Sequence, residues 1–292
     1  MSDFRKAYEK IRPAIVGLGI SASGEIDILG TGFFYTKQGH IITNRHVFEC
    51  LLATKANGQV GIARGASAWV IFPHPTDANH AITGMAALPV ISAVVPPNPF
   101  EGLSAVPDPP LFRNLEPIAA GFPEEADIAI LEARLPTDLD FEVPISPVEI
   151  RRVGSEFEIG TPVAILGYPG GLSVPTSRGS IVRSLQMTPL LQAGSVAGVL
   201  PFPSIPNPEA FVLDMYITPG SSGSPVFLQD GAVIGLVFAT RLRSWPLSRV
   251  ESGVVTTSET EFIGVPNSLG LALPSARFPE GVYKHIRANE AG

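Results

Sequence analysis

The apolar residues of this chain gather in short runs that end at glycine, proline or asparagine. In the first half these runs are AIVGLGIS (14–21), IDILGTGFFYT (26–36), GHIITNRHVF (39–48), AWVIFP (68–73) and DIAILEARL (127–135). In the second half they are TPVAILGYPG (161–170), SRGSIVRSL (177–185), AFVLDMYIT (210–218), GAVIGLVFAT (231–240) and LGLALP (269–274). Short runs rich in Ile, Val and Phe and bounded by turn residues are typical of β-strands. Two successive sets of them predict two small antiparallel barrels or sandwiches.

The two ends of the chain and its middle have a different pattern. Residues 3–12 alternate charged and apolar positions in a way that fits a helix, which stops before Pro13, and the tail 275–292 is expected to end in a second short helix. Residues 136–149 are rich in proline and acid, so we expect a crossover there. The chain then divides into a first domain at 1–140 and a second at 141–292.

One stretch of the first half, residues 81–100 (AITGMAALPVISAVVPPNPF), has no charged residue. Its length approaches that of a membrane span, but its prolines interrupt a helix, so no transmembrane span is predicted. We expect an inserted strand or flap within an apolar, proline-rich insertion at about 81–110. A membrane or partner contact is the alternative.

Composition and charge narrow the function classes. The net charge is −7 and no run of Lys or Arg occurs, so a nucleic-acid partner is not expected. The single cysteine, Cys50, excludes an internal disulfide framework and fits a reducing compartment. The first residues are charged and lack the apolar region of a signal peptide. We therefore expect a cytoplasmic protein.

A serine-rich turn, TPGSSGSPVF at 218–227, lies between two apolar runs and is therefore a tight connection inside a packed domain. Such a turn can present one serine to a substrate. A serine hydroxyl is a poor nucleophile unless a base takes its proton, and the base is usually oriented by a carboxylate.

Five histidines are available as the base. His46 ends a strand-like run, whereas His40 lies in a turn where we expect it to be exposed to solvent. His74 and His80 flank Asp77, but their spacing fits no strong ligand pattern, so a polar loop is favoured and no metal site is predicted. Asp127 stands at the start of an apolar run, where a single aspartate is usually a turn residue.

The segments TGFFYTKQGHIITNRHV (31–47), ADIAILEA (126–133) and PGSSGSPVF (219–227) occur in the order His, Asp, Ser. Together they resemble the trypsin-like serine peptidases, and in particular the HtrA (DegP-like) branch. The segment LGYPGGLSVPTSRGSIVRSL (166–185) and the last strands are also similar to that branch. The resemblance implies an all-β, chymotrypsin-like fold of two antiparallel six-stranded β-barrels with short terminal helices.

The resemblance also implies roles for individual residues. His46 would be the general base, Asp127 the carboxylate that orients it, and Ser222 the nucleophile. The backbone N–H groups of Gly220 and Ser222 would form the oxyanion hole. Ser221 and Ser224 would be bystanders, and Gly223 would keep the turn free of side-chain clashes.

The substrate pocket implied by the resemblance has its base near Tyr216 and its wall along Val237, Phe238, Ala239 and Thr240. No acidic residue stands at the base, which argues against cleavage after Lys or Arg. A small or medium apolar residue is the expected P1 side chain. Only 18 residues follow Pro274, so no C-terminal PDZ domain is expected.

The function implied is that of a serine endopeptidase that needs no cofactor and forms an acyl-enzyme on a protein or peptide substrate. Two alternatives stay open. The first is a binding or scaffold protein on a peptidase fold with a blocked cleft. The second is a peptidase that is inactive at rest until an activating protein partner orders its oxyanion-hole loop.

Overall fold

The structure is a computed structural model that describes residues 3–22, 25–49, 52–54, 60–62, 67–75, 82–94, 127–135, 146–153, 158–169, 173–175, 189–200, 208, 210–251 and 254–290. In parts of several strands, including residues 239–251 and 254–268, it describes the backbone alone.

The first half of the chain forms a closed antiparallel barrel with the strand order β1-β6-β7-β8-β3-β2, which the β1–β2 pairing closes. Its strands are β1 (Ile15–Ala22), β2 (Glu25–Phe34), β3 (His40–Thr43), β6 (Ser67–Pro75), β7 (Ile82–Val94) and β8 (Ala129–Ala133). A seventh strand, β10 (Ser173–Pro175), pairs antiparallel with the first three residues of β2. The short strands β4 (Leu52–Thr54) and β5 (Val60–Ile62) form a separate pair.

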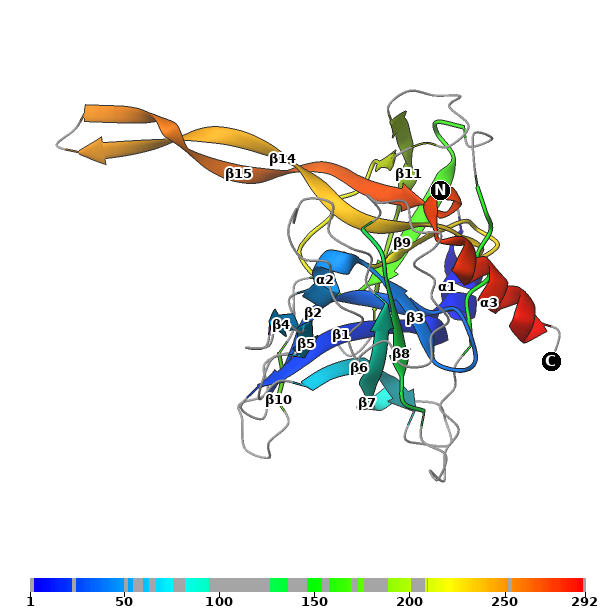
Figure 1. Ribbon diagram of the computed structural model, residues 1–292. Coiled ribbons are helices and arrows are strands. Elements are labelled where there is room, and N and C mark those ends of the chain that lie inside the picture. Colours follow the sequence, from blue (N-terminus) through cyan, green and yellow to red (C-terminus); the bar gives the residue numbers. More distant parts are fainter. Residues whose placement is uncertain are drawn as a thin grey trace.

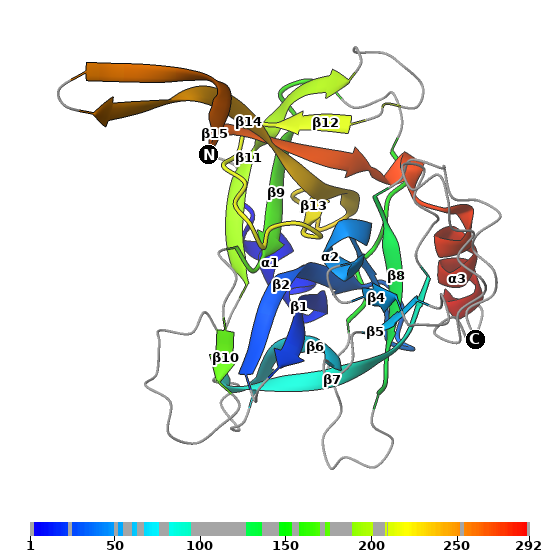
Figure 2. The same ribbon diagram turned by 60° about the vertical axis from the view of Figure 1, so that its left-hand side comes forward.

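The second half forms another closed barrel, in the order β11-β12-β15-β14-β13-β9. Its strands are β9 (Pro162–Gly167), β11 (Leu190–Leu200), β12 (Ala210–Leu213), β13 (Pro225–Phe227), β14 (Val233–Glu251) and β15 (Val254–Pro274). The prediction of two antiparallel six-stranded barrels is therefore confirmed. Figures 1 and 2 show that the barrels lie one above the other.

Two apolar cores support these barrels, and the larger one crosses from the first barrel to the second. It contains Phe33, Ile41 and Leu131 together with Phe227 of the second barrel. The predicted terminal helices, α1 (Arg5–Ile11) and α3 (Glu280–Glu290), also pack on this core. Phe4, just before α1, meets the Phe227 ring edge to face at a centroid distance of 5.9 Å. The barrels and both helices thus share one core.

The segment between the barrels is bonded to both of them. Val148 N–H donates to the Phe34 carbonyl of β2, and Arg151 N–H donates to the Val233 carbonyl of β14. The predicted crossover at 136–149 is described only from residue 146 onward.

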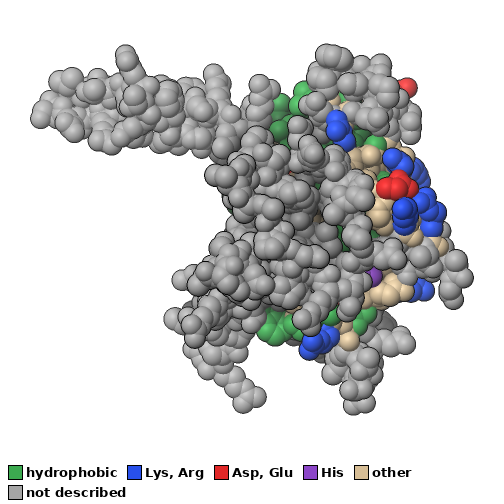
Figure 3. All heavy atoms as spheres, in the orientation of Figure 1, with side chains coloured by type: hydrophobic (Ala, Val, Ile, Leu, Met, Phe, Trp, Pro, Cys, Tyr) green, Lys and Arg blue, Asp and Glu red, His purple; other side chains and the backbone are tan. Residues whose placement is uncertain are grey.

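On the face shown in Figure 3, Lys and Arg side chains gather beside acidic ones near α3. Glu280 of that helix forms salt bridges with Arg152 and Arg287.

Strands β14 and β15 continue beyond the barrel as a long two-stranded arm (Figures 1 and 2). Their pairing runs from Gly235 opposite Pro274 to Glu251 opposite Val254. The apolar pattern predicted that these strands end at residue 240 and begin at 269, so the structure extends both of them.

The apolar stretch at 81–110 differs from its expected role as an insertion. Residues 82–94 are β7, a full barrel strand that pairs with both β6 and β8. Burial explains the lack of charge on one face of the strand, since Leu88, Val90 and Ala93 are buried, whereas Ile91 is exposed. Residues 95–110 lie outside the described residues. In the part of the chain that the structure describes, no helix is long and apolar enough to cross a membrane.

Candidate active site

His46 and Asp127 are brought together by the neighbouring strands β3 and β8. Thr43, the last residue of β3, pairs with Ala129, the first residue of β8. His46 lies three residues after Thr43, in the short helix α2 (Arg45–Glu49), and Asp127 lies two residues before Ala129. Because the strands are antiparallel, both residues emerge at the same end of the pair. The strand-like run that contains His46 thus ends earlier than expected, and His46 itself is helical.

The His46 side chain is held by both oxygens of the Asp127 carboxylate. The Nδ1 atom of His46 lies 2.6 Å from Asp127 Oδ2, and the backbone N–H of His46 donates to Asp127 Oδ1 at 3.0 Å. An ionised carboxylate can only accept hydrogen bonds, so Nδ1 carries the proton and a neutral His46 presents Nε2 as an acceptor. This is the tautomer that a general base requires.

The pair lies at the surface. The side chain of His46 is 46% exposed and that of Asp127 is 27% exposed. Ion pairs this open to water contribute little to stability. Behind them, the buried Asn44 donates from Nδ2 to the Asp127 carbonyl at 2.9 Å and so anchors the backbone of the carboxylate.

The serine-rich segment forms two consecutive tight turns. In the first, Ser221 N–H donates to the Thr218 carbonyl at 3.0 Å, and Gly220 has a φ of 89°. Pro219 before it is fixed at a negative φ, so this is a type II turn. In the second, Ser224 N–H donates to the Ser221 carbonyl at 3.0 Å. Ser222 lies between the two glycines with positive φ, Gly220 and Gly223, and is partly exposed.

The serine turn is packed directly against the first barrel. Thr31 N–H of β2 donates to the Ser222 carbonyl at 2.8 Å. A Cβ atom built on Gly30 would lie 2.6 Å from Val47 Cγ1 and 3.2 Å from the Ser222 carbonyl oxygen. Val47 directly follows His46 in α2. Val47 and the backbone of Ser222 therefore both pack against Gly30. The structure therefore brings the three expected catalytic segments to one place.

Gly223 has no room for a side chain. A Cβ atom on it would overlap the Thr31 carbonyl oxygen and lie 2.7 Å from Thr43 Oγ1. Its φ of 85° is also in the left-handed region. The expectation that this glycine avoids a side-chain clash agrees with these contacts.

The residues expected to form the substrate pocket differ in exposure. The Tyr216 side chain is among the exposed large apolar groups of the described chain, at 52%. Val237 is fully buried in the second core, and its backbone bonds to Gly223 and Ser224. Phe238 is partly buried against the larger core. The Ala239 and Thr240 side chains lie outside the described atoms.

The remaining histidines are placed away from this pair or are not described. His40 is half-buried, and its Nδ1 lies 2.8 Å from Thr36 Oγ1, so the expectation of a solvent-exposed side chain is wrong. The histidine belongs to β3 rather than to a turn. Asp77 and His80, and the side chain of His74, lie outside what is described. Among the described residues, no group of three or more His, Cys, Asp and Glu could hold a metal ion.

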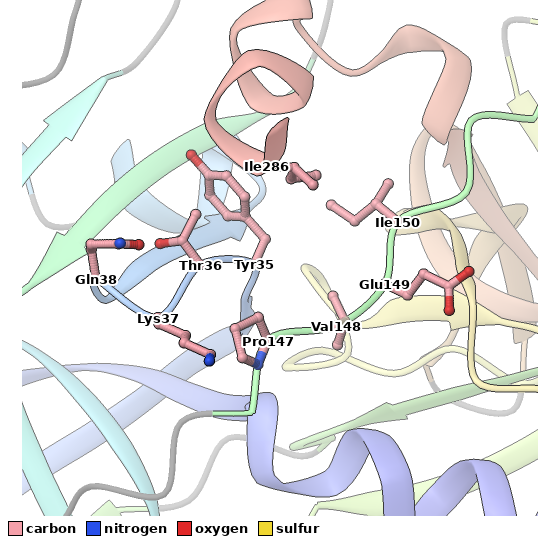
Figure 4. Close-up of a pocket in the computed structure, with 9 residues that line it drawn as sticks. All are labelled: Tyr35, Thr36, Lys37, Gln38, Pro147, Val148, Glu149, Ile150 and Ile286. Carbon is pink, nitrogen blue, oxygen red and sulfur yellow. The ribbon is translucent and has the colours of Figure 1, made fainter. Parts of the chain in front are cut away.

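A cavity of about 330 Å³ lies elsewhere, between the β2–β3 turn, the segment joining the barrels and α3 (Figure 4). Its lining residues are Tyr35, Thr36, Lys37, Gln38, Pro147, Val148, Glu149, Ile150 and Ile286. Burial raises the pKa of the Tyr35 hydroxyl, so this group is neutral at physiological pH. None of the expected catalytic or pocket residues lines this cavity, so it is separate from the candidate active site.

Two supporting residues, Thr31 and Asn44, were not singled out from the sequence. Both lie inside the histidine segment 31–47, in TGFF and TNRH. A polar side chain within an apolar strand, for Thr31, or directly after one, for Asn44, was the available signal. Their partners lie far away in the chain, and only the fold identifies them.

The two barrels, with the paired histidine and aspartate on the first and the serine turn on the second, define the trypsin-like class of peptidase fold. Residues 30–236 match the family model described as a trypsin-like peptidase domain. This match covers more than half of the chain, so the chain belongs to that family.

Solved structures with a similar fold include two of an HtrA-type protease, AlgW. The form with a decapeptide has a TM-score of 0.52 and 12% identity, covering 99% of this chain and 68% of that one. The form with a tripeptide has a TM-score of 0.51 and 14% identity, covering 97% and 63%. At these identities the likeness concerns the fold. No curated protein sequence matches the chain.

Proposed function

We propose that the protein is a serine endopeptidase of the HtrA-like branch, with His46, Asp127 and Ser222 as its catalytic triad. The observation that carries this proposal is the two-point contact between His46 and Asp127, which fixes the imidazole in the tautomer of a general base. The pair is too exposed to contribute much to stability, so a role in chemistry explains it better.

The proposed reaction begins when Ser222 Oγ attacks the carbonyl carbon of the scissile peptide bond. His46 Nε2 takes the hydroxyl proton, and the Asp127 carboxylate stabilises the imidazolium that forms. The same proton then passes to the leaving amine as the carbon–nitrogen bond breaks, which leaves an ester on Ser222. Water, deprotonated by His46, hydrolyses the ester and restores the free hydroxyl.

The oxyanion of the tetrahedral intermediate would accept hydrogen bonds from the N–H groups of Gly220 and Ser222. The type II turn at 218–221 supports this, because the turn type sets the direction in which the Gly220 N–H points. In serine peptidases, one such donor is worth about 10²–10³ in rate.

The proposed substrates are proteins or peptides. The AlgW structures of similar fold are described with a decapeptide and a tripeptide. We propose a small or medium apolar P1 residue, since Tyr216 rather than an acidic residue stands at the expected base of the pocket. We also propose a cytoplasmic location, on the basis of the single cysteine.

Cleavage of a denatured protein and of a mixed peptide library, read by mass spectrometry, tests this proposal. Wild type should cleave and Ser222→Ala should not. Ser221→Ala is the matched control, because Ser221 Oγ is buried and has no hydrogen-bond partner among the residues that the structure describes. The control should cleave like wild type.

Equal cleavage by wild type and Ser222→Ala would exclude Ser222 as the nucleophile. No cleavage by wild type would exclude a peptidase that is active at rest. A binding protein or a partner-activated peptidase would then be the better account.

A further inference from the structure

Thr31 is the point at which the first barrel meets the serine turn. It lies in β2 and is fully buried. Its backbone N–H donates to the Ser222 carbonyl at 2.8 Å, and its Oγ1 donates to the Gly220 carbonyl at 2.8 Å. One residue of the first barrel therefore binds the turn of the second barrel at two positions.

These two positions correspond to the two proposed oxyanion-hole donors. Gly220 and Ser222 would each supply an N–H group to the oxyanion, and each has its carbonyl held by Thr31. The carbonyl of a residue lies in the peptide plane that follows it, and its N–H lies in the plane that precedes it. A held carbonyl therefore fixes the position of the residue and limits the direction of its N–H only through φ and ψ of that residue. Thr31 restricts both donors together.

The direction of the Thr31 hydroxyl proton is determined by its other partner. Tyr168 N–H, just after β9, donates to Thr31 Oγ1 at 2.9 Å. The oxygen thus accepts one hydrogen bond, and its own hydrogen is available for the Gly220 carbonyl. Both contacts are buried, where a hydrogen bond is stronger than in water.

Thr31 is also joined to the strand that precedes the catalytic histidine. Thr43 Oγ1, three residues before His46, donates to the Thr31 carbonyl at 2.7 Å. Thr31 therefore lies between the histidine segment and the nucleophile turn and has hydrogen bonds to both.

We infer that Thr31 is a positioning residue whose hydroxyl holds the oxyanion-hole turn in the conformation that binds the transition state. This inference rests on the proposed function, because it assigns a task within that reaction. Thr31 touches no reacting atom and acts through Gly220 and Ser222.

Loss of the hydroxyl should affect the transition state more than substrate binding. The Gly220 carbonyl would lose its donor, and the turn could then rotate within the limits that glycine allows. A donor displaced by a fraction of an ångström stabilises the oxyanion less, whereas the rest of the cleft is unchanged. We expect the fall in kcat/KM to appear in kcat, with KM nearly constant.

The test compares three variants by their rate of labelling with a fluorophosphonate, which requires both the nucleophile and the oxyanion hole. Thr31→Val keeps the shape and removes the hydroxyl, and Thr31→Ser keeps the hydroxyl. Thr36→Val is the matched control, since Thr36 is equally buried and bonds to His40 through its own hydroxyl, away from the turn. We expect Thr31→Val to label about 10- to 100-fold more slowly, and the other two variants to label near the wild-type rate.

A second measurement separates positioning from a general loss of structure. The proton between His46 Nδ1 and Asp127 should give a far-downfield NMR signal in wild type, and this signal should persist in Thr31→Val. Loss of the signal, or equal slowing of Thr31→Val and Thr36→Val, would overturn the inference.

The two proposals can fail separately. If wild type is labelled on Ser222 and Thr31→Val is labelled equally fast, the proposed function stands and the role of Thr31 is wrong. If wild type is not labelled at all, the proposed function fails, and the role of Thr31 fails with it.

Discussion

The His46–Asp127 pair and the junction around Thr31 adjoin each other, yet they are built in opposite ways. The pair is exposed and small, whereas the junction is buried and ties three segments together through Thr31. A substrate must reach the first and must not enter the second. The comparison teaches that reactivity and rigidity can be assigned to different residues, so substitutions in the two regions should have different signatures.

The largest expected effect is that of Asp127→Asn on activity. An amide NH₂ facing His46 Nδ1 would favour the wrong tautomer, and a fall in kcat of about 10⁴-fold is expected, as for the equivalent change in other serine peptidases. The free energy of unfolding should change by less than about 1 kcal/mol, because the pair is exposed. Peptidase kinetics and urea unfolding measure the two quantities. A large loss of stability would contradict the assignment of the pair to chemistry alone.

Gly223→Ala should damage both activity and stability. The new methyl group would overlap the Thr31 carbonyl oxygen in a backbone conformation that alanine disfavours. We expect a loss of more than about 2 kcal/mol in the free energy of unfolding and a fall in kcat of about 100-fold or more.

Gly160→Ala is the matched control for that variant. Gly160 has a similar φ of 92°, but a Cβ atom there would meet nothing within 4 Å. It should lose stability through backbone strain alone and keep full activity. Equal effects of the two substitutions would show that the contact of Gly223 with Thr31 is unimportant.

Thr43→Val should mainly affect stability. It removes the buried hydrogen bond to the Thr31 carbonyl, which is worth about 1–2 kcal/mol, while the bonds from Thr31 to the serine turn remain. Thermal unfolding and peptidase assays should show a lower Tm with a smaller loss of kcat than in Thr31→Val. Thr43→Ser should restore the Tm. A larger loss of kcat than in Thr31→Val would place the key support at Thr43 instead.

The smallest effect is expected at Asp230, which forms an exposed ion pair with Arg151 and has no proposed role in the chemistry. Partial burial acts to raise the pKa of Asp230, but hydrogen bonds from Ala232 N–H and Arg151 outweigh it and hold the pKa below its ordinary value. A lowered folded-state pKa means that its contribution to stability is present above the unfolded pKa and is lost as the pH falls through the folded one.

Asp230→Asn should therefore differ slightly from wild type in urea unfolding at pH 7, and this difference should shrink on acidification below about pH 4. Activity should not change. A difference that grows in acid would mean that the sign of the pKa shift is wrong.

The barrels were predictable because their strands carry a local signal. AIVGLGIS and DIAILEARL are apolar runs with clear ends, and they became β1 and β8, whereas only the first half of GHIITNRHVF became a strand, β3. The arm was not predictable, because Pro246 and Pro266 lie in its strands and proline normally argues against a strand. Among the described strands, β14 and β15 pair only with each other in the arm. The proline nitrogen, which carries no hydrogen, can therefore lie on the edge that makes no pairing.

The residues of the candidate site were predictable where a sequence motif identifies them. His46, Asp127 and Ser222 follow from their motifs, and the contact between His46 and Asp127 follows from the pairing of β3 with β8. The role of Thr31 did not follow, since its partner Gly220 is 189 residues away and the bond depends on how the two barrels pack. The catalytic roles of His46, Asp127 and Ser222, the assignment of the pocket residues and the cytoplasmic location stay predictions.

Labelling of wild type with a fluorophosphonate, located by peptide mass spectrometry, tests the central claim most directly. The account predicts one adduct, on Ser222, which is absent in His46→Ala although this variant remains folded. An adduct on Ser221 or Ser224, or labelling that persists without His46, would contradict the proposed triad.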